Sequence, residues 1–163
     1  MRGFPVTEAD ILGYKARGFT VRETRTRRAA LTLQQGKRFS SGKRADLDNR
    51  YFRSAWEANV ARYLNYLQSR GVILRWEYEP DEFEFPVKRG PGKFYKPDFK
   101  IWYPDGTFLY WEVKGYMDQA SATKLKRMRK HYPQYRVELI DKYRYYKEIS
   151  PLRGLLPGWE TEQ

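Results

Sequence analysis

The clearest pattern along the chain is helical and lies between Ser54 and Gly71. Apolar residues recur there at intervals of three and four, which places them on one face of a helix. Ser54 is a favourable N-cap residue and Gly71 a favourable stop signal. The pattern predicts an amphipathic helix over residues 54–69, with an apolar face formed by Trp56, Val60, Tyr63, Leu64 and Leu67.

Strand patterns follow this helix. From Val72 to Glu79 the residues alternate, with Val72, Leu74, Trp76 and Tyr78 on one face, as is typical of a half-buried strand. Residues 83–85 are expected to continue this strand after a break at Pro80. Similar patterns predict strands over 94–103, 107–113 and 135–140, and a second helix over 118–131. The middle of the chain therefore has the order helix, strand, strand, strand, helix, strand, which indicates an α/β fold.

The two ends of the chain show weaker patterns. A short helix is predicted over residues 7–17, and residues 18–50 have the poor periodicity of a loop or arm. The last residues are rich in Tyr, Leu and Trp, so we expect them to pack on the core or on a partner. We therefore divide the chain into a basic arm (1–53), a core (54–140) and an aromatic tail (141–163).

The amino-acid composition excludes several kinds of catalytic and metal-binding site. The chain has 163 residues, of which 17% are aromatic, so it can build a core as one domain. It has no Cys and one His, which excludes disulfides, thiolate zinc sites and a Cys nucleophile. Any metal would be held by oxygen, which favours Mg²⁺, with Mn²⁺ as a substitute. No apolar run approaches the roughly 18–20 residues of a membrane span, so we expect a cytoplasmic protein without a membrane partner.

Positive charge is concentrated near the N-terminus. The net charge is +12, and residues 1–53 carry 13 Lys and Arg against 5 Asp and Glu. Such arms commonly neutralise phosphates, although a solvated tail is the alternative. A second basic group lies on the helix predicted over 118–131, where a solvated face is again the alternative. The candidate nucleic-acid contacts are Arg25, Arg27, Arg28, Lys37, Arg38, Lys43, Arg44, Lys126, Arg127 and Lys130.

Three charged residues stand where strands should be buried: Asp98, Glu112 and Lys114. Glu112 and Lys114 share a face because they are two residues apart on one strand. A three-residue turn at 104–106, with Gly106 in the left-handed conformation, would pair Tyr103 with Thr107. That register places Asp98 opposite Glu112, where two carboxylates would repel unless a divalent cation lay between them.

These residues resemble a known nuclease motif. The segments Tyr95-Lys96-Pro97-Asp98-Phe99 and Trp111-Glu112-Val113-Lys114-Gly115 look like the motif of the PD-(D/E)xK nuclease superfamily. Within it, the chain most resembles small phage-encoded endonucleases, including the type that resolves Holliday junctions. The resemblance covers residues 54–140 and implies a restriction-endonuclease-like αβββαβ core, with a mixed central sheet flanked by helices. It also implies Mg²⁺-dependent hydrolysis of DNA to 5′-phosphate and 3′-hydroxyl ends, in the host cytoplasm if the chain is phage-encoded.

The resemblance assigns roles to individual residues. Asp98 and Glu112 would ligate Mg²⁺, with the Val113 carbonyl as an extra ligand. Lys114 would position or help activate the attacking water and steady charge on the phosphate. Glu57, at the start of the first helix, would orient water or complete a second metal site. DNA is the implied partner, and a homodimer is compatible with this interpretation.

Other interpretations of the same residues stay open. Ser54 and Glu57 have the spacing of a capping box, in which Glu57 only satisfies the helix N-terminus. Glu112 and Lys114 could form an ordinary ion pair on a solvated strand face. At the level of function, the alternatives are a non-catalytic nucleic-acid-binding protein and a sequence-specific or transposon-type end-cleaving nuclease.

Overall fold

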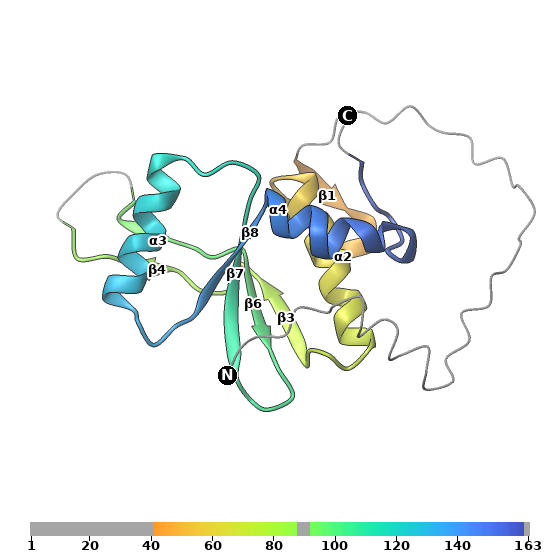
Figure 1. Cartoon of the computed structure of the whole chain (residues 1–163), viewed down its shortest axis with the longest axis horizontal. Helices are drawn as coiled ribbons and strands as arrows, with labels where there is room; N and C mark the ends of the chain where they lie inside the picture. Colours follow the sequence, from red (N-terminus) through yellow and green to blue (C-terminus); the bar gives the residue numbers. More distant parts are fainter. Residues whose placement is uncertain (1–40, 88–91, 162–163) are drawn as a thin grey trace, which may run out of the picture. The chain divides into compact units, whose positions relative to one another are not determined.

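The computed structural model describes residues 41–87 and 92–161 (Figure 1). The chain divides into two units, Met1–Arg38 and Phe39–Gln163, and the described residues all belong to the second. The helix predicted over 7–17 therefore lies outside the described residues, as do five of the predicted DNA contacts: Arg25, Arg27, Arg28, Lys37 and Arg38.

The first predicted helix is confirmed as α2 (Ala55–Ser69). Ser54 is its N-cap, and the Ser54 hydroxyl accepts a hydrogen bond from the Glu57 backbone N–H at 3.1 Å. This bond satisfies one of the donors that every helix N-terminus leaves free. The apolar face of α2 is buried as predicted, with Val60 and Leu64 fully inaccessible to solvent.

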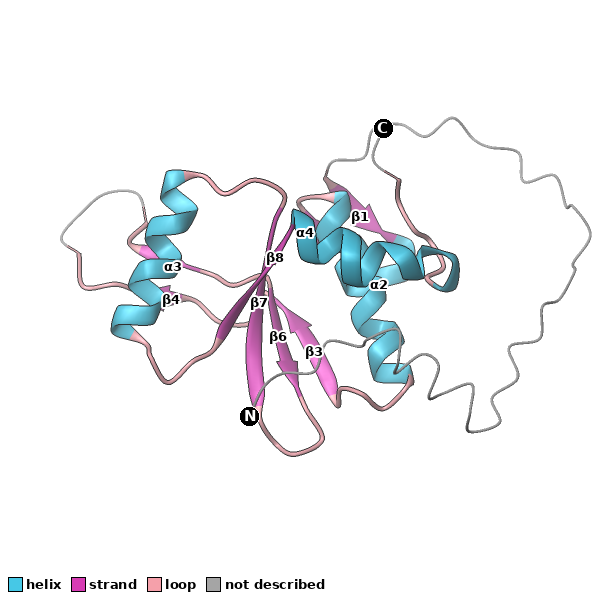
Figure 2. Ribbon diagram, viewed as in Figure 1, coloured by secondary structure: helices cyan, strands magenta, loops and turns pink. Residues whose placement is uncertain are grey.

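A four-stranded mixed sheet forms the centre of the described unit (Figure 2). Its strand order is β3-β6-β7-β8, with antiparallel pairing between the first three and parallel pairing between β7 and β8. The parallel connection runs through α3, as expected of a crossover between parallel strands. The strands are β3 (Arg75–Tyr78), β6 (Phe99–Trp102), β7 (Phe108–Lys114) and β8 (Val137–Asp141), and the helix is α3 (Gln119–His131). The prediction of an α/β fold with a mixed central sheet is thereby confirmed.

Two apolar clusters cover the two faces of this sheet. One contains the buried face of α2 together with Trp111 and Val113 of β7. The other contains Tyr110 of β7, Met128 of α3 and a small two-stranded sheet, β4 (Phe83–Glu84) paired with β5 (Phe94–Tyr95). Alternation along β7 therefore directs Trp111 and Val113 toward one cluster, and Glu112 and Lys114 away from it.

The hairpin between β6 and β7 has the predicted turn. The Tyr103 N–H donates to the Thr107 carbonyl at 2.9 Å, and the Gly106 N–H donates to the Tyr103 carbonyl at 3.0 Å. Gly106 has φ +81°, in the left-handed region, as the sequence predicted. The ladder continues to Phe99 opposite Trp111, so Asp98 and Glu112 occupy the next pair of positions.

A substitution at Gly106 tests this turn. Gly106→Val should lower the free energy of unfolding by about 1–2 kcal/mol, because a β-branched residue resists the left-handed conformation. The cost should be purely conformational, since a Cβ at this position would meet no atom within 4 Å. Urea unfolding measures it, with Gly106→Asn as the control, because Asn tolerates this conformation. Equal stability of the Val and Asn variants would show that position 106 does not require the left-handed conformation.

Some strands are shorter than predicted. The segment 72–79 contributes only Arg75–Tyr78, and the segment 94–103 divides into β5 and β6. Pro97 lies at the division and lacks the N–H that a continuous ladder requires. Residues 83–85 do not extend the central sheet, because Phe83 pairs instead with Tyr95 in the small sheet.

Residues 42–53, which the sequence assigned to the arm, belong to the folded unit. They form a hairpin of β1 (Gly42–Arg44) and β2 (Arg50–Phe52), joined by a 3₁₀ turn at Ala45–Leu47. Leu47 and Phe52 are buried in the same cluster as α2. These two apolar side chains explain why the fold begins upstream of Ser54, where little periodicity marks it in the sequence.

The tail packs on the core. It forms α4 (Lys142–Arg144), a π-helical turn (Tyr145–Ile149) and a 3₁₀ helix (Ser150–Leu155). Tyr145 stacks on Trp56 of α2 with ring centroids 4.1 Å apart. No helix among the described residues is long and apolar enough to cross a membrane.

Candidate active site

The site is built around two buried carboxylates, Asp98 and Glu112, whose residues are 2% and 5% exposed. Asp98 accepts a hydrogen bond from the Val113 N–H at 2.7 Å through Oδ2. Glu112 accepts one from the Tyr95 hydroxyl at 3.0 Å through Oε2. The hairpin register thus brings together two acids that lie 14 positions apart in the sequence.

Burial and mutual repulsion raise the pKa of Asp98 to about 8. Loss of hydration is the largest cause, followed by the negative charges of Glu112 and Glu57. The Val113 N–H and the charge of Lys114 act in the opposite direction and do not overcome these effects. Asp98 therefore keeps its proton to a higher pH than an exposed carboxyl group does.

Lys114 lies beside this pair. Its Nζ atom is 3.1 Å from Oε1 of Glu112, and its side chain is 30% exposed. Burial lowers the pKa of Lys114, but the attraction of Glu112 and Asp98 outweighs it and raises the pKa overall. Lys114 is therefore an ammonium ion at neutral pH in this arrangement.

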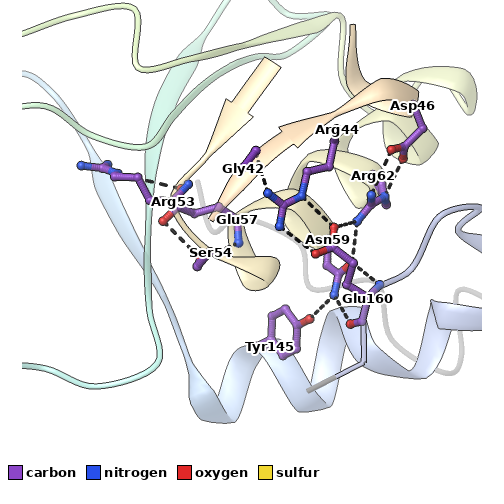
Figure 3. Close-up of polar contacts among 10 residues, drawn as sticks. All are labelled: Gly42, Arg44, Asp46, Arg53, Ser54, Glu57, Asn59, Arg62, Tyr145 and Glu160. Carbon is purple, nitrogen blue, oxygen red and sulfur yellow. Dashed lines mark hydrogen bonds and ion pairs between the residues drawn. The ribbon is translucent and has the colours of Figure 1, made fainter. Parts of the chain in front are cut away.

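Glu57 joins the site from the first turn of α2. It is 7% exposed, and its Oε2 atom accepts from the Arg53 N–H at 3.0 Å and from the Tyr78 hydroxyl at 2.5 Å. Its Oε1 atom accepts from the Ser54 hydroxyl at 3.2 Å (Figure 3). Ser54 and Glu57 thus form the N-cap half of a capping box, but Glu57 reaches back to the Arg53 N–H instead of the Ser54 N–H. The same carboxylate is close enough to Asp98 to raise the pKa of that residue.

Two charged residues of this cluster, Arg53 and Glu79, were not predicted from the sequence. Arg53 Nη2 lies 2.9 Å from Asp98 Oδ1 and 2.5 Å from Glu79 Oε1, and Arg53 Nε lies 4.0 Å from Glu57 Oε2. Glu79 has φ +47°, which is rare for a residue other than Gly and is often associated with functional sites. The sequence signals for both were weak: Arg53 is four residues before Glu57, and Glu79 directly precedes Pro80.

The donor set suits a hard divalent cation. Among the described residues, no group of three or more His, Cys, Asp or Glu side chains is arranged to hold a metal ion. Asp98 and Glu112 nevertheless supply two carboxylates side by side, and the backbone carbonyl of Val113 is a further oxygen donor on β7. Oxygen donors of this kind fit Mg²⁺ or Mn²⁺, and a cation here would relieve the repulsion that raises the pKa of Asp98.

Glu57→Gln separates capping from chemistry. Gln can accept from Arg53 and Tyr78 and donate to Ser54, so we expect a change in unfolding free energy below about 1 kcal/mol. If the chain cleaves DNA, as the resemblance implies, and the charge of Glu57 serves that reaction, cleavage should slow at least about tenfold, a barrier increase of about 1.4 kcal/mol. Cleavage at the wild-type rate would leave Glu57 with only its capping role.

The remaining predicted DNA contacts have different environments. Lys43 of β1 and Lys126 and Lys130 of α3 are exposed. Arg127 is half-buried and donates to the Gly92 carbonyl at 2.7 Å, which ties α3 to the segment before β5. The structure thus leaves Lys43, Lys126 and Lys130 accessible to phosphates, whereas Arg127 already has an internal partner.

Arg44 was predicted to contact DNA, but its side chain is buried inside the folded unit. It is 6% exposed and pairs with Glu160 of the tail at 2.7 Å. Glu160 also pairs with Arg62 of α2 at 2.9 Å, and its backbone bonds to Asn59, so β1, α2 and the tail meet in one polar network (Figure 3). Burial of this charge with its counter-ion makes Arg44 a part of the fold rather than of a phosphate-binding surface.

Comparison with known proteins places the chain in a family. No curated protein and no solved structure matches it. Residues 38–148 match a family described as a protein of unknown function, DUF1064. The match spans α2, the whole central sheet and the carboxylate cluster, and ends within the tail. It covers about two thirds of the 163 residues, and the chain therefore belongs to the DUF1064 family.

Proposed function

We propose that this protein is a metal-dependent DNA endonuclease that hydrolyses phosphodiester bonds with Mg²⁺. The observation that carries the proposal is the buried pair of Asp98 and Glu112, held together by the β6–β7 hairpin with Lys114 beside them. Purely structural sites rarely bury two carboxylates together, because each raises the cost of ionising the other. A buried acid with a raised pKa, such as Asp98, is typical of functional sites.

The arrangement of elements supports the same proposal. The elements follow one another in the order α2, β3, β6, β7, α3, β8, with β4 and β5 between β3 and β6. This αβββαβ order is compatible with the restriction-endonuclease-like core that we propose. Asp98 directly precedes one central strand, and Glu112 and Lys114 lie on the next, as in the PD-(D/E)xK motif. Resemblance of fold is an analogy, so the charged cluster remains the main support.

Each residue has a role in the proposed reaction. A bound Mg²⁺ would supply positive charge to the reacting phosphate and activate water. Asp98 and Glu112, with the Val113 carbonyl, would hold the ion. Lys114 would act through its charge, because its raised pKa keeps it protonated and suited to stabilising negative charge on the phosphate. Glu57 would orient the attacking water by hydrogen bonding, and the products would carry 5′-phosphate and 3′-hydroxyl ends.

A substrate panel tests the proposal. The whole chain is incubated with supercoiled plasmid, a four-way junction, a flap and a single strand, each in Mg²⁺ and in EDTA. We expect cleavage of at least one substrate in Mg²⁺ and none in EDTA. Binding of all substrates without cleavage in either condition would favour the non-catalytic alternative. The substrate cleaved fastest identifies the preferred DNA structure.

Deletion of residues 1–38 tests the basic arm. Each phosphate that the protein no longer neutralises should reduce the slope of log K against log salt concentration by about 0.9 for duplex DNA. We therefore expect weaker binding with a flatter salt dependence, measured by fluorescence anisotropy. Lys126→Gln/Lys130→Gln in the full chain tests the predicted contacts of α3 in the same way. An unchanged slope after deletion would show that the arm does not bind DNA.

A further inference from the structure

The side chain of Arg53 is exposed, yet it contacts three carboxylates that are more deeply buried. Arg53 lies between β2 and the N-cap Ser54, and its backbone N–H is bound to Glu57, so its position is set by the start of α2. Its side chain is 56% exposed, whereas the carboxylates that it contacts are 2% to 24% exposed. The guanidinium group therefore closes the solvent side of the acidic cluster.

The charges of this cluster do not balance. Its acids are Glu57, Glu79, Asp98 and Glu112, and its bases are Arg53 and Lys114. When all four acids are ionised, the excess of two negative charges equals the charge of one divalent ion. Lys114 is paired with Glu112, which leaves Arg53 as the cation in contact with Asp98.

We propose that Arg53 is a positioning residue whose guanidinium occupies the cation position beside Asp98 in the metal-free protein and moves to a phosphate of the DNA when a divalent ion binds. The inference rests on the proposed function. A divalent ion bound through Asp98 would compete with Arg53 Nη2, which lies 2.9 Å from Asp98 Oδ1. Since the Arg53 side chain is long and already half in solvent, it can turn outward without disturbing buried packing.

The guanidinium group suits both positions. Several N–H donors in a planar fork allow one Arg to bridge two carboxylates or to grip a phosphate. Lys has a single nitrogen and a more strongly hydrated charge, so it would hold Asp98 and Glu79 less well. The proposal therefore predicts that Arg53 opposes metal binding in the free protein and favours DNA binding once the ion is present.

Calorimetric titration with Mn²⁺ in the absence of DNA tests the exchange. We expect Arg53→Gln to bind Mn²⁺ at least about fivefold more tightly than the wild type, because a competing cation is removed. Arg75→Gln is the matched control, since Arg75 is similarly exposed and pairs with Glu77 outside the cluster. The Mn²⁺ affinity of Arg53→Lys should lie between those of the wild type and the Gln variant. If the Gln variant does not fold, the comparison of Arg53→Lys with the wild type tests the exchange.

DNA binding supplies the second measurement. In EDTA, Arg53→Gln should bind a duplex within about twofold of the wild type, whereas with a bound divalent ion it should bind several-fold more weakly. Calcium is the ion for this measurement, with intact DNA confirmed on a gel. Equal Mn²⁺ affinity in the wild type and both Arg53 variants would overturn the exchange.

Asp98→Asn distinguishes the two proposals. If Asp98→Asn weakens Mn²⁺ binding but the Arg53 variants do not change it, only the role of Arg53 fails. If the wild type shows no Mn²⁺ binding that Asp98→Asn removes, the metal site and the exchange fail together.

Discussion

Asp98→Asn and Glu112→Gln are each expected to reduce Mg²⁺-dependent cleavage at least about 100-fold, a barrier increase of about 2.7 kcal/mol. Each substitution removes one of the two negative charges that would hold the ion, while it keeps the size of the side chain. Asn can still accept from the Val113 N–H, and Gln can still accept from the Tyr95 hydroxyl, so the fold should be retained.

Two exposed acids provide matched controls. Asp48→Asn changes a residue in the left-handed conformation that Asn also tolerates, and Glu77→Gln changes an acid paired with Arg75. Both should cleave at the wild-type rate. Initial rates on the preferred substrate, at equal protein concentration, provide the comparison. If a site variant cleaves as fast as its control, the substituted residue has no role in the proposed reaction.

The second large effect concerns stability and pH. The pKa of Asp98 is raised in the folded protein, so between about pH 4 and pH 8 the folded state binds more protons than the unfolded state. The contribution of Asp98 to stability is therefore complete below about pH 4 and is lost as the pH rises through about 8. In EDTA, Asp98→Asn should lack this loss and should be more stable than the wild type at high pH.

Thermal unfolding in EDTA at pH 5 and pH 9 measures the difference. We expect the advantage of Asp98→Asn to grow between these values by about 4 kcal/mol, since each pH unit between pH 5 and the pKa of about 8 contributes about 1.4 kcal/mol. Asp48→Asn should show no such pH-dependent change. An advantage that stays constant or shrinks as the pH rises would contradict the raised pKa of Asp98.

Local sequence signals predicted the part of the site that lies on the hairpin. The Pro104-Asp105-Gly106 turn carries its own conformational preference, and one turn determines the register of every residue pair along β6 and β7. The capping signal at Ser54 and the stripe of apolar residues likewise determined α2 and the place of Glu57. These features depend on neighbours within a few residues.

Other features depend on contacts that periodicity does not encode. Arg53 meets Asp98 across 45 positions, and Glu160 meets Arg44 across 116. Neither ion pair has a local sequence signal, because the chain has many Arg, Asp and Glu residues and the sequence does not show which of them meet in the fold. The hairpin at 42–53 was similarly hidden, since Leu47 and Phe52 are isolated apolar residues in a basic segment. Long-range packing, rather than propensity, placed these residues.

Diffraction from crystals soaked in Mn²⁺ is the sharpest test of the proposed metal site, because anomalous scattering locates the ion itself. We expect a peak between Asp98 and Glu112, at about 2.0–2.6 Å from a carboxylate oxygen of each. We also expect that Arg53 has left Asp98 Oδ1. Absence of a peak at this pair, with Arg53 still bound to Asp98 in saturating Mn²⁺, would contradict both the metal site and the exchange.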